Sequence, residues 1–145
     1  MIAIGSDHGG FALKQTIIEH LKERGLEYKD FGTNDEKSCD YPIFAKAAAE
    51  AVASGECEKG IVVCTSGIGI SIAANKVKGI RCAHCTDPFS AKLTREDNDA
   101  NMLALGGGLI GPKQGIEIVD TFLDTPFSNL EKHIRRINLI KDMEA

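Results

Sequence analysis

Short apolar runs alternate with stretches of helical periodicity along the whole chain. The apolar runs predict five strands, at residues 1–5, 26–31, 60–64, 80–85 and 102–105. The stretches that follow them predict helices at about 11–24, 42–53, 70–75, 88–97, 112–123 and 129–143. Asp87 followed by Pro88 marks a helix start, because aspartate caps free N–H groups and proline suits the first helical turn.

The predicted strands at 1–5, 60–64 and 102–105 are continuous apolar runs rather than alternations of apolar and polar residues. Strands of that kind are buried on both faces, as in a parallel sheet that helices cover on either side. The pattern therefore predicts a three-layer αβα, Rossmann-like (flavodoxin-like) α/β fold with a five-stranded parallel sheet. The chain has 145 residues without a linker or repeat, so we expect residues 1–145 to form a single domain.

Composition and charge exclude several classes of protein. The net charge is −4 and no basic stripe is present, which argues against a nucleic-acid partner. No stretch approaches roughly 18 consecutive apolar residues, so we expect no membrane span. The first ten residues lack both a basic region and a long apolar run, so we expect no secretory signal and a cytoplasmic location.

The five cysteines are an odd number, which favours free thiols in a reducing compartment. Cys82 and Cys85 have C-x-x-C spacing, but a zinc site would need a second pair. A redox pair of this kind should open a helix, whereas these two residues lie inside a predicted strand. We therefore expect neither a metal site nor a redox site here.

In a fold of this type, ligands bind beyond the carboxyl ends of the strands, where the strand order reverses. The loops that follow the predicted strands should therefore carry the functional residues. These loops are Ser6–Gly10, Thr33–Tyr41, Cys64–Gly69, Thr86–Pro88 and Gly106–Gly111.

The strongest candidate is the loop Cys64-Thr65-Ser66-Gly67-Ile68-Gly69, which joins a strand to a helix. Free N–H groups and the positive helix end would stabilise a thiolate, a phosphate or an oxyanion there. The alternative is that Cys64 is a small buried side chain in a tight glycine turn. The loop lacks the arginine of a cysteine phosphatase loop, the Gly-Lys-Ser/Thr of a Walker loop and the glycine spacing of a nucleophile elbow.

Four further segments have both a functional and a structural interpretation. Asp7 and His8 would hold a sugar or phosphate, or Asp7 would simply cap a helix. Lys132 and Arg136 share a helix face that would suit a phosphate, or would simply be solvated. Residues 95–101 have the composition of a solvated turn, and 106–111 is expected to be a glycine-rich turn rather than a dinucleotide site.

Taken together, several segments resemble one known family, that of ribose-5-phosphate isomerase B and the galactose-6-phosphate isomerase subunits. The resemblance spans nearly the whole chain in order and spacing. It rests on the segments 5–10, 40–42, 64–69, 72–76, 79–81, 97–101 and 133–137.

The resemblance implies a metal-free, cofactor-free aldose–ketose isomerase of the pentose phosphate pathway, which interconverts ribose 5-phosphate and ribulose 5-phosphate through an enediolate. Cys64 would be the base, Ser66 would move protons and Asp97 would stand where the family often has a ring-opening histidine. The site would also include residues that bind the sugar or the enediolate, and residues that bind the phosphate. The former are Asp7, Tyr41, Thr65, Ser66, Gly67, Ile68, Gly69 and Asn98, and the latter are His8, Lys132 and Arg136.

In this family the last helix, here about 129–143, reaches the partner subunit, which implies a homodimer or a tetramer with shared sites. Three positions depart from the common pattern: Asp97 replaces histidine, Lys132 replaces arginine and Gly108 replaces arginine. A smaller positive charge and a roomier pocket leave open a six-carbon substrate, such as allose 6-phosphate or galactose 6-phosphate. A non-catalytic module that binds sugar phosphates is the alternative from another functional class.

Overall fold

The computed structural model describes residues 1–144 and contains one sheet of five parallel strands. The strands are β1 (Ile2–Ser6), β2 (Tyr28–Asp30), β3 (Lys59–Cys64), β4 (Cys82–His84) and β5 (Met102–Gly106). Their spatial order is β2-β1-β3-β5-β4, so the last strand in sequence lies inside the sheet and β4 forms its edge. The predicted five-stranded parallel sheet is confirmed.

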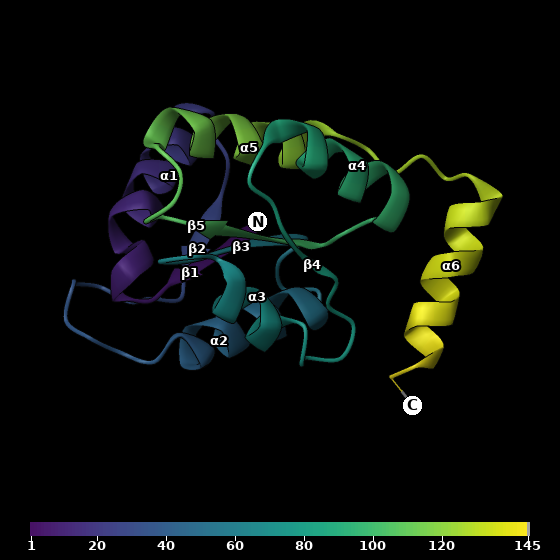
Figure 1. The fold of residues 1–145 in the computed structure, drawn as a ribbon, viewed down its shortest axis with the longest axis horizontal. Coiled ribbons are helices and arrows are strands. Elements are labelled where there is room, and N and C mark those ends of the chain that lie inside the picture. Colours follow the sequence, from purple (N-terminus) through teal and green to yellow (C-terminus); the bar gives the residue numbers. More distant parts are fainter. Residues whose placement is uncertain (145) are drawn as a thin grey trace.

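Helices cover both faces of this sheet and complete the predicted three layers (Figure 1). The helices are α1 (Phe11–Glu23), α2 (Tyr41–Ala53), α3 (Ile68–Ala74), α4 (Pro88–Asn98), α5 (Pro112–Asp124) and α6 (Glu131–Asp142). In Figure 1, α1, α4 and α5 lie above the sheet, and α2 and α3 lie below it. A short 3-10 turn, η1 (His8–Gly10), precedes α1 and was not expected from the sequence.

The three central strands and the two edge strands differ in length and burial. Every residue of β1 and β5 is buried, and so are all residues of β3 except Lys59. The edge strands β2 and β4 have only three residues each, shorter than the predicted strands at 26–31 and 80–85. The side chain of Asn75 pairs with both the N–H and the C=O of Cys82, at 2.7 and 2.9 Å. An amide that takes both bonds occupies part of the free edge that β4 would otherwise present.

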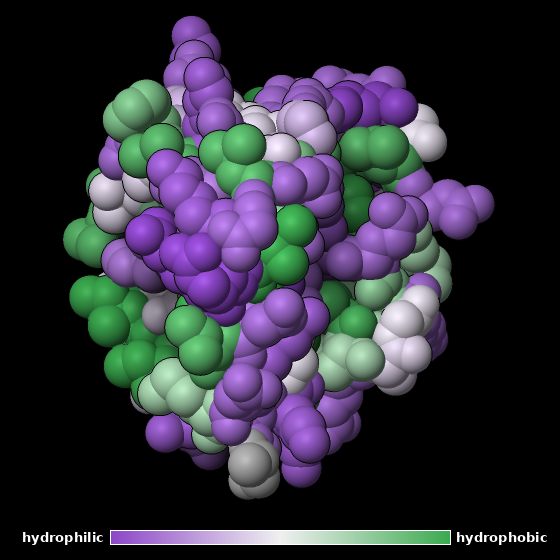
Figure 2. All heavy atoms as spheres, turned by 90° about the vertical axis from the view of Figure 1, so that its right-hand side faces the viewer, coloured by the Kyte–Doolittle hydropathy of each residue, from purple (hydrophilic) through white to green (hydrophobic). Residues whose placement is uncertain are grey.

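The last helix, α6, stands apart from the three layers and packs against α4 (Figure 1). The Nε2 atom of His133 lies 3.4 Å from a carboxylate oxygen of Asp97, and the N–H of Ser128 donates to the carbonyl of Glu96 at 3.3 Å. Figure 2 looks onto this side and shows apolar residues beside the polar ones. Within residues 1–144, no helix combines the length and apolar character that a bilayer crossing requires.

Candidate active site

The strand order reverses between β1 and β3, and the loops that follow these two strands meet there. The N–H of Asp7 donates to the carbonyl of Val63 at 3.2 Å. A Cβ atom on Gly10 would collide with that same carbonyl oxygen, and one on Gly9 would collide with the Thr65 side chain. Glycine at both positions therefore permits the two loops to touch.

Cys64 is the last residue of β3 and its side chain is buried. The backbone N–H of Gly67 donates to the Sγ atom at 3.1 Å. Such a bond stabilises negative charge on sulfur, because an ionised acceptor binds an N–H more strongly than a neutral one does. Cys64 is therefore buried, and a backbone amide of the loop points at its sulfur.

The turn that directs this amide needs glycine at position 67. Gly67 has a φ of +79°, in the left-handed region, and an added Cβ would lie 2.7 Å from the carbonyl carbon of Leu105. The same Cβ would lie 2.8 Å from the His84 ring. The turn is thus held between β5 and the end of β4.

The glycine-rich segment after β5 supports the Cys64 loop from the other side. The N–H of Gly107 donates to the carbonyl of Cys64 at 2.8 Å, and the N–H of Gly108 donates to the carbonyl of Thr65 at 2.9 Å. A Cβ on Gly106 would lie 2.5 Å from the carbonyl oxygen of Ser66. The segment is a glycine-rich turn, as expected, and its amides bind the Cys64 loop at the carboxyl edge of the sheet.

The rest of the loop presents polar groups near Tyr41, the first residue of α2. The N–H of Ile68 donates to the Ser66 hydroxyl at 3.1 Å. A Cβ on Gly69 would lie 2.8 Å from the Tyr41 ring, so the phenol packs directly on the start of α3. Thr65 and the Ile68 side chain are exposed.

Asp7 and His8 follow β1 at the same edge. The Asp7 carboxylate accepts a bond from the N–H of Gly10 at 3.1 Å, so this residue caps η1 as the structural interpretation predicted. The Nδ1 atom of His8 accepts a bond from the N–H of Cys39 at 3.2 Å. Seven of the predicted site residues, 7–8 and 65–69, therefore gather with Cys64 and Tyr41 at the carboxyl edge of the sheet.

Four other predicted residues lie elsewhere in this chain. Asp97 and Asn98 end α4, which runs back from the carboxyl edge to the amino edge of the sheet. Cys64 lies at the carboxyl end of β3, and the two ends of that strand are about 17 Å apart, at about 3.3 Å per residue. Asp97 and Asn98 are therefore separated from Cys64 by about the length of a strand. Lys132 and Arg136 are exposed on α6, beyond α4. The chain alone does not bring these four residues to the Cys64 loop.

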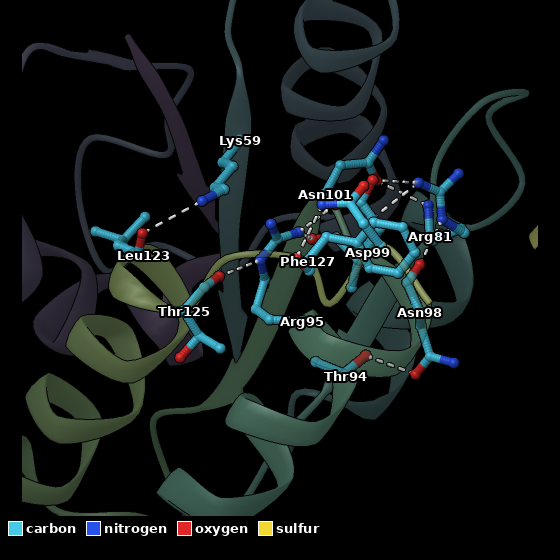
Figure 3. Close-up of polar contacts among 12 residues, drawn as sticks. Lys59, Arg81, Thr94, Arg95, Asn98, Asp99, Asn101, Leu123, Thr125 and Phe127 are labelled. Carbon is cyan, nitrogen blue, oxygen red and sulfur yellow. Dashed lines mark hydrogen bonds and ion pairs between the residues drawn. The ribbon is translucent and has the colours of Figure 1, made fainter. Parts of the chain in front are cut away.

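A buried arginine organises the amino edge, and sequence reasoning missed it (Figure 3). Arg95 is only 6% exposed and donates to the carbonyls of Ala100 and Thr125 at 2.7 and 3.0 Å. It also forms a 2.8 Å ion pair with Asp99. The interpretation of residues 95–101 as a solvated turn is therefore wrong for Arg95. The local sequence gave no sign of this burial, because two of the three acceptors are backbone carbonyls.

A lysine lies close to this arginine. Lys59 donates to the carbonyl of Leu123 at 3.3 Å (Figure 3). Burial lowers the pKa of Lys59 from its ordinary value, and the nearby charge of Arg95 lowers it further. Two cations thus share the amino edge of the sheet.

Cys82 and Cys85 bear out the sequence argument about their place in the chain. Cys82 opens β4 and Cys85 follows its last residue, so the pair belongs to a strand rather than to a helix start. Burial raises the pKa of the Cys82 thiol to about 12, and it also raises that of Cys85. All five cysteines are free thiols, and among residues 1–144 no three metal-ligating side chains come together.

Two open cavities flank the sheet. One, of about 480 Å³, lies between α2 and α3, and Tyr41, Gly69, Ile72 and Lys76 are among its lining residues. The other, of about 520 Å³, lies between α6 and β4 and is lined in part by Asn98. Each cavity is thus lined by at least one predicted site residue. Those of the first cavity lie at the carboxyl edge of the sheet, and that of the second lies at the amino edge.

Comparison with known proteins gives consistent results. A sequence model described as Ribose/Galactose Isomerase matches residues 2–140. The ribose-5-phosphate isomerase B of Escherichia coli (strain K12) is 46% identical over 143 residues, which cover 99% of this chain and 95% of that protein.

Solved structures agree over the same length. The structure of Clostridium thermocellum ribose-5-phosphate isomerase B matches with a TM-score of 0.97 at 52% identity, covering 99% of this chain and 96% of that one. A ribose-5-phosphate isomerase B from Mycoplasma genitalium with bound ribulose 5-phosphate matches with a TM-score of 0.94 at 39% identity, covering 99% and 95%.

Proposed function

The chain belongs to the ribose/galactose isomerase family, and we propose that it interconverts ribose 5-phosphate and ribulose 5-phosphate without a metal or cofactor. The observation that carries this proposal is the Gly67 N–H that points at the Sγ atom of Cys64, at the carboxyl edge of the sheet. An aldose–ketose isomerase needs a base beside the carbon that loses its proton, and a stabilised thiolate supplies one.

In the proposed reaction, the Cys64 thiolate removes the proton next to the carbonyl and returns it to the neighbouring carbon. The intermediate is an enediolate, whose negative oxygen needs hydrogen-bond donors at fixed positions. The N–H groups of residues 65–69 other than those of Gly67 and Ile68, which donate to Cys64 and Ser66, would supply them, because a helix start carries N–H groups without helical partners. The Ser66 hydroxyl would move a proton between the two enediolate oxygens.

The sugar and its phosphate would lie between the loops that meet at this edge. Asp7 and Tyr41 flank the Cys64 loop on either side and would bind sugar hydroxyls. His8 would donate to the phosphate from Nε2, because its Nδ1 atom already accepts a bond. The remaining positive charge for the phosphate would come from Lys132 and Arg136.

Because Lys132 and Arg136 stand far from Cys64 in this chain, we assign them to the site of a second copy, in a homodimer. The same holds for Asn98 and for Asp97, which would take the proton of the anomeric hydroxyl when the sugar ring opens. The exposed apolar side chains of α6 support such an interface, because they lie on the same helix as the two cations. They are Ile134, Leu139 and Ile140, which are 42%, 59% and 42% exposed, and Leu130, the N-cap residue before the helix, is 52% exposed.

A coupled assay with ribose 5-phosphate in the presence of EDTA tests the reaction and the base together. Cys64→Ala should lower kcat by roughly 10²–10⁴-fold, the contribution typical of a general base. Cys57→Ala is the matched control, because it also removes a fully buried thiol but lies at the opposite end of the sheet. Turnover that survives in Cys64→Ala, or that EDTA abolishes, would contradict the proposed chemistry.

A second experiment tests the shared site. A folded, purified Cys64→Ala chain is mixed with a Lys132→Ala/Arg136→Ala chain under conditions that exchange subunits. If each site combines Cys64 of one chain with α6 of the other, mixed dimers keep one intact site and activity returns to roughly a quarter of wild type. No recovery from two inactive parents, with exchange verified by mass, would place each site within one chain.

The same assay with allose 6-phosphate and galactose 6-phosphate decides between five-carbon and six-carbon substrates. The family description includes both ribose and galactose isomerases, which makes the comparison necessary. A higher kcat/KM on a six-carbon sugar would keep the isomerase chemistry and change the substrate. Binding of all these sugars without turnover would favour a non-catalytic module.

A further inference from the structure

The segment between β2 and α2 contacts His8 through a backbone amide. The N–H of Cys39 donates to the Nδ1 atom of His8 at 3.2 Å. A backbone N–H can only donate, so Nδ1 carries no proton and the proton of the neutral ring is on Nε2. The carboxylate of Asp7 lies 4.0 Å from Nδ1, too far to compete as an acceptor for a proton there.

This arrangement leaves Nε2 as the nitrogen that donates to a ligand. The two ring nitrogens point in different directions, so Nε2 is turned away from Cys39. The His8 side chain is 38% exposed, so a ligand can approach it. A histidine with its proton on the other nitrogen would present a lone pair to an anion instead of a donor.

A buried lysine fixes the first half of the segment. Lys14, on α1, is completely buried, and its Nζ atom donates to both Asp30 oxygens at 2.8 Å and to the Thr33 carbonyl at 2.6 Å. All three ammonium protons therefore have acceptors. The N–H of Ser6 donates to the Gly32 carbonyl at 2.6 Å, and the N–H of Thr33 donates to the Ser6 carbonyl at 2.7 Å. The segment is thus tied to α1 and to the end of β1.

The second half of the segment ends at α2. Residues 34–38 are exposed, whereas Cys39 is partly buried against His8. The next residue, Asp40, is the N-cap of α2, and its carbonyl accepts a bond from the N–H of Ile43 at 3.2 Å. Cys39 therefore lies between the exposed residues 34–38 and the start of α2. Lys14 anchors the chain just before the exposed residues, at Asp30 and Thr33.

We propose that residues 30–40 form a positioning element for His8. The Cys39 amide selects the tautomer with the proton on Nε2, and Lys14 is the positioning residue that holds the segment in place. Neither residue is among the substrate-binding residues proposed above. The proposal rests on the proposed function only in assigning the phosphate to Nε2, and its first test needs no turnover.

The first test is the ¹⁵N–¹H correlation spectrum of the histidine rings in the wild-type protein, at a pH where His8 is neutral. His8, assigned by comparison with His8→Asn, should show the Nε2–H tautomer. Addition of inorganic phosphate should shift its Nε2–H resonance. A predominant Nδ1–H tautomer would overturn the proposal, whether or not the protein isomerises any sugar. The correct tautomer without turnover would leave the positioning element standing while the proposed reaction fails.

The second test removes the amide proton. Cys39→Pro lacks the N–H, whereas the matched control Cys39→Ala keeps it and removes only the thiol. We expect Cys39→Pro to raise KM for ribose 5-phosphate roughly tenfold, with kcat within about twofold, because a lost donor to phosphate weakens binding. Cys39→Ala should retain the wild-type tautomer and KM. Equal KM values in the two variants would overturn the proposal.

The third test removes the anchor, and it also covers the case in which Cys39→Pro does not fold. Lys14→Met/Asp30→Asn eliminates the buried ion pair without leaving an uncompensated charge. Its His8 spectrum should show a mixture of both tautomers. Lys22→Met is the matched control, because Lys22 lies on the same helix and pairs with Glu19 in solvent. An unchanged Nε2–H tautomer in the folded double variant would overturn the role of Lys14.

Discussion

Substitution of Gly67 by alanine tests whether one glycine turn sets both the stability and the chemistry of the Cys64 loop. Gly67 has a φ of +79°, and an added Cβ would lie 2.7 Å from the Leu105 carbonyl carbon and 2.9 Å from the Gly106 nitrogen. Both neighbours are backbone atoms of β5, so they cannot rotate away as a flexible side chain can. The new methyl group must therefore displace the turn.

The substitution should change both the unfolding free energy and kcat. The left-handed backbone costs an alanine about 1–2 kcal/mol, and forcing a methyl group into a packed site adds about 1–3 kcal/mol. We therefore expect Gly67→Ala to lose roughly 2–5 kcal/mol of unfolding free energy. If the turn moves, the Gly67 N–H leaves the Cys64 sulfur. A hydrogen bond to a charged group contributes about 1.5–3 kcal/mol, which corresponds to a fall in kcat of roughly 10–100-fold.

Gly55→Ala separates the two causes of instability. Gly55 has a φ of +85°, but a Cβ there has no atom within 4 Å. This control should lose only about 1–2 kcal/mol, the cost of the backbone conformation, and should keep kcat. Urea denaturation measures both variants, and the coupled assay measures kcat. If Gly67→Ala loses no more stability than Gly55→Ala and keeps its kcat, then neither the close packing nor the amide–sulfur bond has the role assigned to it.

Three further predictions concern the amino ends of the strands and the free side of β4. Arg95→Met should lose about 3–4 kcal/mol of unfolding free energy, measured by urea denaturation, because one buried and one partly buried carbonyl lose their donor. Lys92→Met, which breaks an exposed pair, should lose less than about 0.5 kcal/mol, and equal losses would contradict the network. Because burial lowers the pKa of Lys59 below 10.5, the unfolded chain binds its proton more tightly in the alkaline range below that value. Wild-type stability should therefore rise with pH there relative to Lys59→Met, and parallel profiles would refute this. Asn75→Ala should expose the edge of β4 and increase self-association beyond that of the wild type in light scattering, and a mass equal to that of the wild type would argue against edge protection.

Much of the fold was predictable because its determinants are local. A continuous apolar run marks a buried strand wherever it occurs, so the central strands were located within one residue of their observed bounds. Asp87 caps α4 through the N–H of Ser90 at 2.7 Å, as its position before Pro88 predicted. The Cys64 loop was also identified from the chain alone, since a strand end, two glycines and a helix start are adjacent in sequence.

The edges of the sheet and its strand order depended on more distant contacts. Nothing in the apolar runs indicates that β5 inserts between β3 and β4, because any of these strands could pair with either neighbour. The predicted strands at 26–31 and 80–85 were also longer than the observed β2 and β4. A strand at an edge has a partner on one side only, and at β4 the Asn75 side chain takes up part of the free side.

The set of elements and the chemistry of their loops follow from the sequence alone, because periodicity, caps and turns act within about ten residues. Which charges are buried and which site residues meet depends on contacts between segments that are far apart in the chain. Lys14 and Arg95 look like ordinary surface residues in sequence, yet both are buried by partners that include backbone carbonyls 19 and 30 positions away. The family resemblance groups Asp97 and Asn98 with the Cys64 loop in one site. Because α4 runs antiparallel to the strands, it carries them to the opposite edge of the sheet.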